Sequence, residues 1–408
     1  MTLIECFDRE PVDNVIACLR LRPEKVIFLG NEKDMELPLK RYQKFFANHD
    51  MKIRLVSCAV RMDDIRDIAD ALEEIIQNEN QCVIDVTGGA EQVVMAVGMV
   101  LAELDDSARH RVDVQKFDPM DGQVMDTDGN GWVIPGDPDY LTVNEVIALH
   151  GGIVHPRTEQ PPKRYKPADL QPLWETMCAE GRDWNKMVMA LNEFESRCDS
   201  DTDIYLPLRD VASTVARFEE KEVLVRQLLE KLEHCGVIRD NSGMNTLRYT
   251  YPDPLLRSCA QKAGNVLETK TLLEARSVQK DGKPYFQDCI MSVNIDWDGV
   301  VHDPADHIPE TRNEIDGIMV HGVVPLFVSC KNGDVSEDEL YKLSTVAQRF
   351  GGAYARKMLI VTDLDRKGPA ATRAFVQRAR EMNIYVVKDA ASLSAAGWRR
   401  AFLDAMEA

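Results

Sequence analysis

The sequence predicts an α/β protein made of an N-terminal domain, a mainly helical connector and a C-terminal domain. Three observations support this division. Residues 1–150 alternate short apolar runs with amphipathic stretches, a proline-rich basic segment follows, and residues 261–408 again alternate apolar runs with helical patterns. Of the 408 residues, 44% are hydrophobic and 29% are charged, which is typical of a globular protein and not of a disordered or fibrous one.

The N-terminal domain, residues 1–153, is expected to hold a parallel sheet covered by helices on both faces. Four apolar runs are typical of buried strands: TLIECFD, KVIFLG, KIRLVSCAV and QCVIDVTGG. Two helical stripes lie between or after them, formed by Ile65, Ile68, Leu72, Ile75 and Ile76 and by Val93, Val94, Val97, Val100 and Leu101. The runs VDVQKFDP and GWVIPGD predict a hairpin around the turn MDTDGNGW. Ligands of such sheets bind in the loops at the carboxyl ends of the strands.

The connector begins after a linker. Residues 154–168, VHPRTEQPPKRYKPA, contain four prolines and four basic residues and predict an extended segment. Residues 169–260 are expected to be mainly helical, and the strands GVIRD and LRYTYP around NSGMN complete a winged-helix pattern. Because the strong helix EEKEVLVRQLLEKLE carries more acid than base, we favour a role in joining domains over one in binding DNA.

The C-terminal domain, residues 261–408, is expected to be an α/β sheet with an antiparallel hairpin in its middle. It begins with the helix NVLETKTLLEAR, followed by the strands YFQDCIMSVNIDW, EIDGIMVHG and PLFVSCK. The helix EDELYKLSTVAQRF, the strand KMLIVTD, the helix PAATRAFVQRAREM and the strand NIYVVKD come after them.

Side chains that can carry chemistry gather on this hairpin. Because side chains alternate along a strand, Glu314 and Asp316 share one face, and Lys331 shares a face with Ser329 on the next strand. The hairpin brings Asp316 near Lys331, and Glu268 on the preceding helix offers a further carboxylate. Carboxylates beside a lysine suit a hard divalent cation and phosphodiester hydrolysis. Acidic residues near a turn and a lysine at a strand end are also common solvated features, and spacing alone favours that interpretation.

A second set of candidate residues follows the N-terminal strands. The segment after CVIDV consists of Thr87, Gly88, Gly89, Ala90, Glu91 and Gln92. Its glycines allow close approach of the backbone to a ligand, and the helix that it opens offers free N–H groups to phosphate. The loops FDREPVDN and LGNEKD should line the same rim, with Phe7, Asp8, Arg9 and Asn31 as candidates. Gly-Gly is also an ordinary strand-to-helix turn, and Arg9 is equally suited to a surface ion pair.

The charge of the N-terminal domain bears on how a ligand is recognised there. Residues 1–150 hold 15 Lys and Arg against 29 Asp and Glu, which opposes anion binding in general. Recognition of a phosphate-containing ligand would therefore depend on backbone N–H groups and on contacts to its bases.

The helix with Glu268, the strand with Asp316 and the strand PLFVSCKNG resemble the PD-(D/E)xK restriction-endonuclease-like superfamily. The order of the whole chain resembles the CRISPR-associated CARF nucleases, with a Rossmann-like CARF domain, a winged-helix connector and a nuclease domain. The resemblance covers essentially all 408 residues and is sharpest at NEID (313–316), FVSCKN (327–332) and VTGGAEQ (86–92). It implies a cytoplasmic, homodimeric effector of type III CRISPR defence. Such an effector cuts DNA or RNA with Mn²⁺ or Mg²⁺ when a cyclic oligoadenylate binds, and cyclic tetra-adenylate is the expected activator.

The resemblance also implies roles for single residues. Asp316 and Glu268 would be metal ligands, the backbone carbonyl of Cys330 would add an oxygen, and Lys331 is the motif lysine. Ser329 departs from the family, which usually has Glu or Asp two residues before the lysine. Glu314 is expected to supply the displaced carboxylate, and loss of nuclease activity is the other consequence of this departure.

Three other functions fit parts of the sequence. The segment HDPADH contains His302, Asp303, Asp306 and His307, as an HD-type phosphohydrolase would, but a polar loop at the mouth of the nuclease site explains it better. A ligand-responsive winged-helix transcription regulator with an inactive nuclease-like domain is the main alternative. A nucleotide-binding dehydrogenase is disfavoured because no GxGxxG follows an early strand.

The remaining features indicate the compartment. The ten cysteines form no CxxC pair and several lie in apolar runs, which favours a reducing cytoplasm over a disulfide framework or a zinc ribbon. No apolar run approaches the ~18 residues of a membrane span. The start MTLIECFDRE turns acidic too early for a signal peptide.

Overall fold

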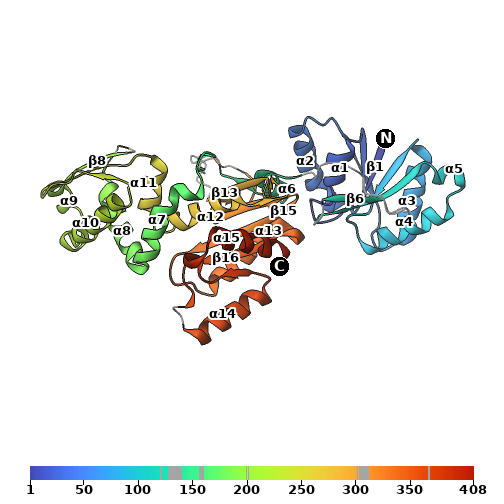
Figure 1. Ribbon diagram of the computed structural model, residues 1–408. Helices are drawn as coiled ribbons and strands as arrows, with labels where there is room; N and C mark the ends of the chain where they lie inside the picture. The colour runs from blue at the N-terminus through green and yellow to red at the C-terminus, as the bar shows by residue number, and fades with distance from the viewer. Residues whose placement is uncertain are drawn as a thin grey trace.

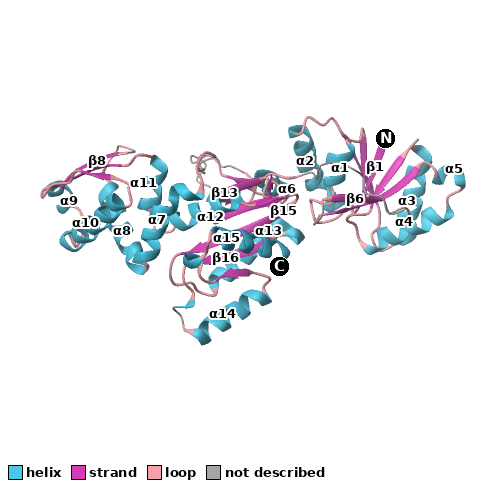
Figure 2. Cartoon of the chain, viewed as in Figure 1, coloured by secondary structure: helices cyan, strands magenta, loops and turns pink. Residues whose placement is uncertain are grey.

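The protein is described here from a computed structural model that covers residues 1–119, 122–126, 140–155, 160–198, 200, 202–300, 302, 312–365 and 368–408. Figure 1 shows the N-terminal domain at one end, the connector at the opposite end and the C-terminal sheet between them. Among these residues the strands form two six-stranded sheets, one three-stranded sheet and one short two-stranded ladder. Figure 2 shows that helices flank both large sheets.

The N-terminal sheet has the strand order β3-β2-β1-β4-β5-β6. Its strands are β1 (Thr2–Cys6), β2 (Lys25–Gly30), β3 (Arg54–Ala59), β4 (Cys82–Asp85), β5 (Val112–Asp118) and β6 (Gln123–Asp126). Its helices are α1 (Ile16–Leu21), α2 (Glu32–Asn48), α3 (Ile65–Asn78), α4 (Glu91–Glu103) and α5 (Asp106–Arg109). β1 to β5 are parallel, and the apolar residues of the sheet divide between two hydrophobic clusters, one of which includes the stripes of α3 and α4. The predicted sheet, covered on both faces, is confirmed.

The predicted hairpin of this domain is placed wrongly. β5 pairs with β6 in an antiparallel register in which Asp118 lies opposite Gln123. The Gly122 N–H donates to the Asp118 carbonyl at 2.8 Å, and Gly122 takes φ 64°, so the chain turns before the expected MDTDGNGW. The predicted second strand, GWVIPGD, lies outside the described residues.

The connector has the predicted winged-helix order with one additional strand. Its elements are α7 (Pro167–Glu180), α8 (Arg182–Glu195), β8 (Asp203–Pro207), α9 (Leu208–Ala212), α10 (Phe218–His234), β9 (Arg239–Asp240), β10 (Thr246–Thr250) and α11 (Pro254–Gln261). The strand β8 pairs with β10, and the sequence analysis did not predict it. β8 is only five residues long and alternates buried with exposed side chains, a weak signal beside the strong stripe of α10.

One buried carboxylate connects the connector to the chain that enters the C-terminal domain. Glu195 accepts hydrogen bonds from the Tyr249 and Tyr251 hydroxyls at 2.6 and 2.8 Å, from Arg257 Nε at 3.0 Å and from Gln261 Nε2 at 2.7 Å. Burial of a charge is tolerated because every partner is a donor. The network fixes α11, and α12, which carries Glu268, begins four residues after α11 ends.

The C-terminal sheet has the strand order β17-β16-β15-β14-β13-β7. Its strands are β7 (Ile153–Val154), β13 (Asp288–Asp296), β14 (Arg312–His321), β15 (Val324–Lys331), β16 (Arg356–Val361) and β17 (Tyr385–Val387), and β11 (Gln279–Lys280) and β12 (Lys283–Pro284) form the two-stranded ladder. The helices are α6 (Val143–Leu149), α12 (Asn265–Ser277), α13 (Asp338–Gly351), α14 (Pro369–Glu381) and α15 (Ala395–Glu407), with short 3-10 turns η2 (Gly352–Tyr354) and η4 (Ala390–Ser392). β13 to β15 are antiparallel and β15 to β17 are parallel, as expected.

The sequence analysis did not predict the last helix, α15, or the short strand β7. The last helix, α15, packs on α12 and buries Trp398 and Phe402, and the spacing of these two residues is the helical signal that would have found it. β7, at the predicted border between the N-terminal domain and the linker, pairs with β13. Gln160 continues this contact, because its side chain exchanges two hydrogen bonds with the Met291 backbone at 2.7 and 2.9 Å.

Within the described part of the chain, no helix combines the length and the apolar character needed to cross a membrane.

Candidate active site

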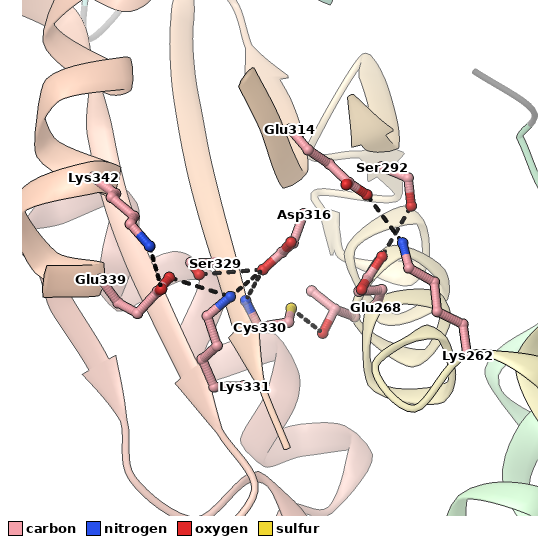
Figure 3. A network of polar contacts seen from close by, with 11 residues as sticks. Lys262, Glu268, Ser292, Glu314, Asp316, Ser329, Cys330, Lys331, Glu339 and Lys342 are labelled. Atoms are coloured by element: carbon pink, nitrogen blue, oxygen red, sulfur yellow. Dashed lines mark hydrogen bonds and ion pairs between the residues drawn. The ribbon is translucent and has the colours of Figure 1, made fainter. Parts of the chain in front are cut away.

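Asp316 on β14 is the centre of a polar network in the C-terminal domain (Figure 3). Registered pairing of β14 with β15 ends at Gly317 opposite Val328. Beyond that point the Asp316 side chain replaces the backbone partner of β15, since its Oδ2 accepts from the Cys330 N–H at 2.6 Å. The same oxygen lies 3.2 Å from Ser329 Oγ and 3.4 Å from Lys331 Nζ. The structure therefore brings the predicted aspartate and lysine together.

Lys331 has a second carboxylate partner that the sequence analysis did not identify. Its Nζ lies 3.2 Å from Glu339 Oε2, and Glu339 Oε1 lies 3.2 Å from Lys342 Nζ. Burial lowers the pKa of Lys331, but the charges of Asp316 and Glu339 outweigh burial, so its pKa is raised and the ammonium stays charged. The sequence signal for Glu339 is its place in the acidic first turn of α13, the helix that follows Lys331.

Glu268, in the first turn of α12, is buried on the other side of Asp316 (Figure 3). Its Oε2 accepts from Ser292 Oγ at 2.9 Å. Burial, followed by the charge of Asp316, raises the pKa of Glu268 to about 7. A Cβ at Gly264 would lie 2.8 Å from Glu268 Oε1, so the absence of a side chain at Gly264 leaves room for this carboxylate.

Ser292 holds Glu268 from an unusual backbone position. Ser292 has φ 48° within β13, and it lies between the pairs Met291–Gly317 and Val293–Ile315, opposite Asp316. A left-handed conformation at a residue other than glycine costs about 1–3 kcal/mol, and such strained residues cluster at active sites. No pattern in the sequence predicts the positive φ of Ser292 or its contact with Glu268.

Glu314 lies on the rim of the network. Its Oε1 is 3.1 Å from Lys262 Nζ, and its side chain is 45% exposed. It extends from β14 like Asp316, as strand alternation predicts, but its recorded ion pair is with Lys262 and not with Lys331.

The donors at this site are oxygen atoms. Among the residues described, no three His, Cys, Asp or Glu side chains are grouped closely enough to hold a metal ion by themselves. Glu268 and Asp316 are close enough for the charge of one to raise the pKa of the other. The Cys330 carbonyl points to the same side of β15 as the Cys330 N–H, which donates to Asp316. This carbonyl oxygen is therefore on the side of β15 that faces Asp316. Two carboxylates and a backbone oxygen, completed by water, fit a hard divalent cation.

The predicted ligand loop of the N-terminal domain packs on the loop that follows β1. Asp8 Oδ2 accepts from the Gly89 N–H at 3.0 Å. A Cβ at Gly88 would lie 2.6 Å from the Asp8 Cβ, and Gly89 takes φ 96°, so both positions need glycine. Thr87 ties the loop to β5, since its Oγ1 accepts from the Phe117 N–H at 2.7 Å. Ala90 caps α4 without a side-chain hydrogen bond, and Glu91 and Gln92 form the exposed first turn of this helix.

The other predicted ligand residues divide into two groups. Phe7 is buried, and it joins Asp8 and Arg9 in lining a cavity of about 670 Å³ that Trp297 and Arg349 of the C-terminal domain also line. The Arg9 side chain is almost fully exposed, 3.8 Å from Asp34. Asn31 caps α2 by accepting from the Lys33 N–H at 3.0 Å. The structure thus places Asp8 and the glycine loop together and leaves Asn31 with a capping role.

The loop after β1 also contacts the C-terminal domain. Glu10 Oε2 accepts from the Ala353 N–H at 2.7 Å, and Asp13 Oδ1 accepts from the Tyr354 hydroxyl at 2.5 Å. Gly352 takes φ 56°, and a Cβ there would overlap Glu10 Oε2. Burial raises the pKa of Asp13 to about 7. We call the Glu10–Ala353 and Asp13–Tyr354 hydrogen bonds the interdomain contact.

The alternative site in HDPADH lies almost entirely outside the described residues. Only His302 of this segment is described, and its Nε2 is 2.9 Å from Asp298 Oδ2.

Comparison with known proteins places this geometry in a known fold. No protein-family model and no curated protein matches the sequence significantly. Among solved structures, protein VC1899 from Vibrio cholerae matches with a TM-score of 0.69 and 16% identity over 100% of this chain and 97% of that chain. Can2 from Sulfobacillus thermosulfidooxidans, in complex with cyclic tetra-adenylate, matches with a TM-score of 0.64 and 17% identity over 100% of this chain and 97% of that chain.

A third structure, a type III CRISPR defence DNA nuclease activated by cyclic oligoadenylate, has a TM-score of 0.47 and 17% identity over 89% of this chain and 45% of that chain. The likeness to Can2 and VC1899 extends over the whole chain and establishes the fold. The Rossmann-like domain, connector and C-terminal α/β domain that the resemblance to CARF nucleases predicts are confirmed.

Proposed function

We propose that this chain is a cyclic-oligoadenylate-activated, metal-dependent nuclease of type III CRISPR defence. The observation that carries the proposal is the position of Asp316 between Lys331 and the buried Glu268. This arrangement occurs in a chain whose whole fold is that of Can2, a protein solved in complex with cyclic tetra-adenylate. The oxygen donors, the charged lysine and the fold support the same chemistry.

The roles follow from the contacts. Glu268, Asp316 and the Cys330 carbonyl would hold Mn²⁺ or Mg²⁺, which lowers the pKa of a bound water and neutralises charge on the phosphate. Lys331 is partly buried and charged, so it stabilises the negative charge that develops on the phosphoryl group during hydrolysis. Ser329 donates to Asp316 and orients it, which is a task that a hydroxyl performs without being a metal ligand.

The activator would bind at the glycine loop of the N-terminal domain. The first N–H groups of α4 and the N–H of Gly89 suit a phosphate, and cyclic tetra-adenylate is the ligand that we propose. Asp8 already accepts a hydrogen bond from the Gly89 N–H, so a phosphate that binds this N–H has to displace the Asp8 carboxylate. Since Asp8 also accepts from the Glu10 N–H at 2.8 Å, ligand binding is linked to the interdomain contact.

A second copy of the chain would complete the activator site. Helix α4 exposes Val94, Met95 and Met99 by 43%, 57% and 45%, and the open space over Gly98 flattens this face. An exposed apolar face on a helix that begins at the ligand loop is typical of an interface. Two loops related by two-fold symmetry match a ring of four identical nucleotides.

Replacing Met95 and Met99 by aspartate together is therefore expected to give a monomer that no longer responds to the activator. Two carboxylates from each subunit, four in all, in an apolar interface would cost several kcal/mol, enough to lower the dimer affinity by at least about a thousandfold. Light scattering after size-exclusion chromatography measures the mass. Met189→Asp changes an exposed methionine of the connector, which is 69% exposed, and should remain dimeric. A dimeric double variant would contradict this assignment of the interface.

The proposed function is tested by cleavage of plasmid DNA, single-stranded DNA and RNA with Mn²⁺, with and without cyclic tetra-adenylate. We expect cleavage only when both are present and complete loss on addition of EDTA, because the proposed mechanism needs a divalent cation to lower the pKa of the attacking water. Binding of cyclic tetra-adenylate without cleavage of any substrate would refute the nuclease and favour the ligand-responsive regulator.

A further inference from the structure

We propose that Glu339 is the positioning residue of Lys331. The inference rests on the proposed nuclease function. It concerns the residue that holds the lysine in place, which the sequence motif does not identify.

Position 329 cannot perform this task. Ser329 is buried, and its hydroxyl is directed to Asp316 Oδ2 at 3.2 Å. Asp316 alone holds Lys331 weakly, because the distance to Nζ is 3.4 Å and the same oxygen also accepts the Cys330 N–H at 2.6 Å. Glu314 does not help, because its recorded ion pair is with Lys262.

Glu339 supplies the missing negative charge from another element. Helix α13 runs back along β15 and β16, so the first turn of the helix comes close to the end of β15. Glu339 Oε2 reaches Lys331 Nζ at 3.2 Å, which is shorter than the contact of Lys331 with Asp316. Lys342 holds the other oxygen, Oε1, at 3.2 Å, so the glutamate is itself fixed (Figure 3).

This geometry makes Glu339 a positioning residue and not a metal ligand. Its ion pairs are with two lysines, whereas the charge of Asp316 acts on Glu268 and raises its pKa. A lysine side chain has about 2 kcal/mol of rotamer entropy, and a single long contact does not restrict it. Two carboxylates on opposite sides define one position for Nζ, beside the phosphate that is to be cleaved.

The test compares Glu339→Gln with Asp338→Asn in the full-length, activated protein. Both variants remove one negative charge from the first turn of α13, so their effects on the helix are alike. Asp338 is exposed and not part of the network around Lys331. We expect Glu339→Gln to lower kcat about tenfold to a hundredfold with KM unchanged, because the lysine acts on the transition state. Asp338→Asn should keep kcat within about twofold.

Melting temperature and affinity for cyclic tetra-adenylate are measured for both variants, so that a folding defect is recognised. A kcat of Glu339→Gln equal to that of Asp338→Asn, or a rise in KM with kcat unchanged, would overturn the inference. Lys342→Ala keeps the Lys331–Glu339 pair and should lower kcat far less than Glu339→Gln does.

Crystal structures of the wild type and of Glu339→Gln separate this inference from the proposed function, because they locate Lys331 whether or not the protein cleaves nucleic acid. We expect Nζ to leave Asp316 in the variant. If Nζ keeps its place beside Asp316, Glu339 does not position the lysine, even if the wild type proves to be a nuclease. If the wild type cleaves nothing, the nuclease proposal fails and the Lys331 geometry is still decided.

Discussion

Alanine at Lys331 or Asp316 is expected to abolish measurable cleavage and to leave the affinity for cyclic tetra-adenylate unchanged. Lys331→Ala removes the lysine that lies 3.4 Å from Asp316, and Asp316→Ala removes the carboxylate that accepts from Lys331, Ser329 and the Cys330 N–H. Losing a single preorganised electrostatic group at a reacting centre costs at least about a hundredfold to a thousandfold in rate. Each substitution here also disturbs the groups that remain, so the loss should reach the detection limit.

The structure offers matched controls for both substitutions. Lys342→Ala removes an exposed lysine of the same network, and Asp334→Ala removes an exposed aspartate whose recorded partner is Arg182. Both controls should retain most of the activity, since exposed ion pairs contribute about 0–1 kcal/mol. Calorimetric titration with cyclic tetra-adenylate should give the same Kd for all four variants, because the glycine loop lies in the other domain. Cleavage that survives in both Lys331→Ala and Asp316→Ala would refute the site.

The parts of the site that could be predicted are those that depend on strand periodicity. Alternation along β14 and β15 places Glu314 with Asp316 and Lys331 with Ser329, and a hairpin then brings Asp316 to Lys331. The helices α3, α4 and α10 were found for the same reason, because their apolar stripes repeat at the helical period. The prediction of the hairpin turn in the N-terminal domain was wrong because the sequence contains two turn signals close together. The chain turns at the earlier one, which contains Gly122, and not at MDTDGNGW.

Glu339 and Ser292 could not be predicted because their contacts depend on tertiary placement. Glu339 contacts Lys331 only because α13 folds back against β15. The sequence EDELYKLSTVAQRF predicts a helix but not the direction in which that helix packs on the sheet. Ser292 reaches Glu268 through a positive φ in a strand that otherwise looks regular. The same holds for the interdomain contact, whose partners Glu10 and Ala353 are separated by 343 positions in sequence.

Glu10→Ala is expected to raise cleavage in the absence of activator about tenfold to a hundredfold, which corresponds to the ~1.5–3 kcal/mol that hydrogen bonds to a charged group contribute. The reason is competition at the Gly89 N–H, which donates either to the Asp8 carboxylate or to a ligand phosphate. The chain of hydrogen bonds from Gly89 through Asp8 and Glu10 to Ala353 is thus incompatible with bound activator. The interdomain contact therefore belongs to the conformation without bound activator. In that conformation it restrains α13, because η2, which holds Ala353 and Tyr354, directly follows α13.

Thermodynamic linkage supplies a second measurement for the same variant. If the interdomain contact opposes activator binding, then weakening it must raise the affinity for cyclic tetra-adenylate together with the basal rate. Tyr354→Phe removes the other half of the contact and should change both quantities in the same direction. Glu36→Ala removes an exposed glutamate of α2, paired with Lys40, and should change neither. If Glu10→Ala instead keeps the basal rate and loses activation, the contact transmits the signal of the ligand and does not restrain the nuclease, because a restraint that is removed can only release activity.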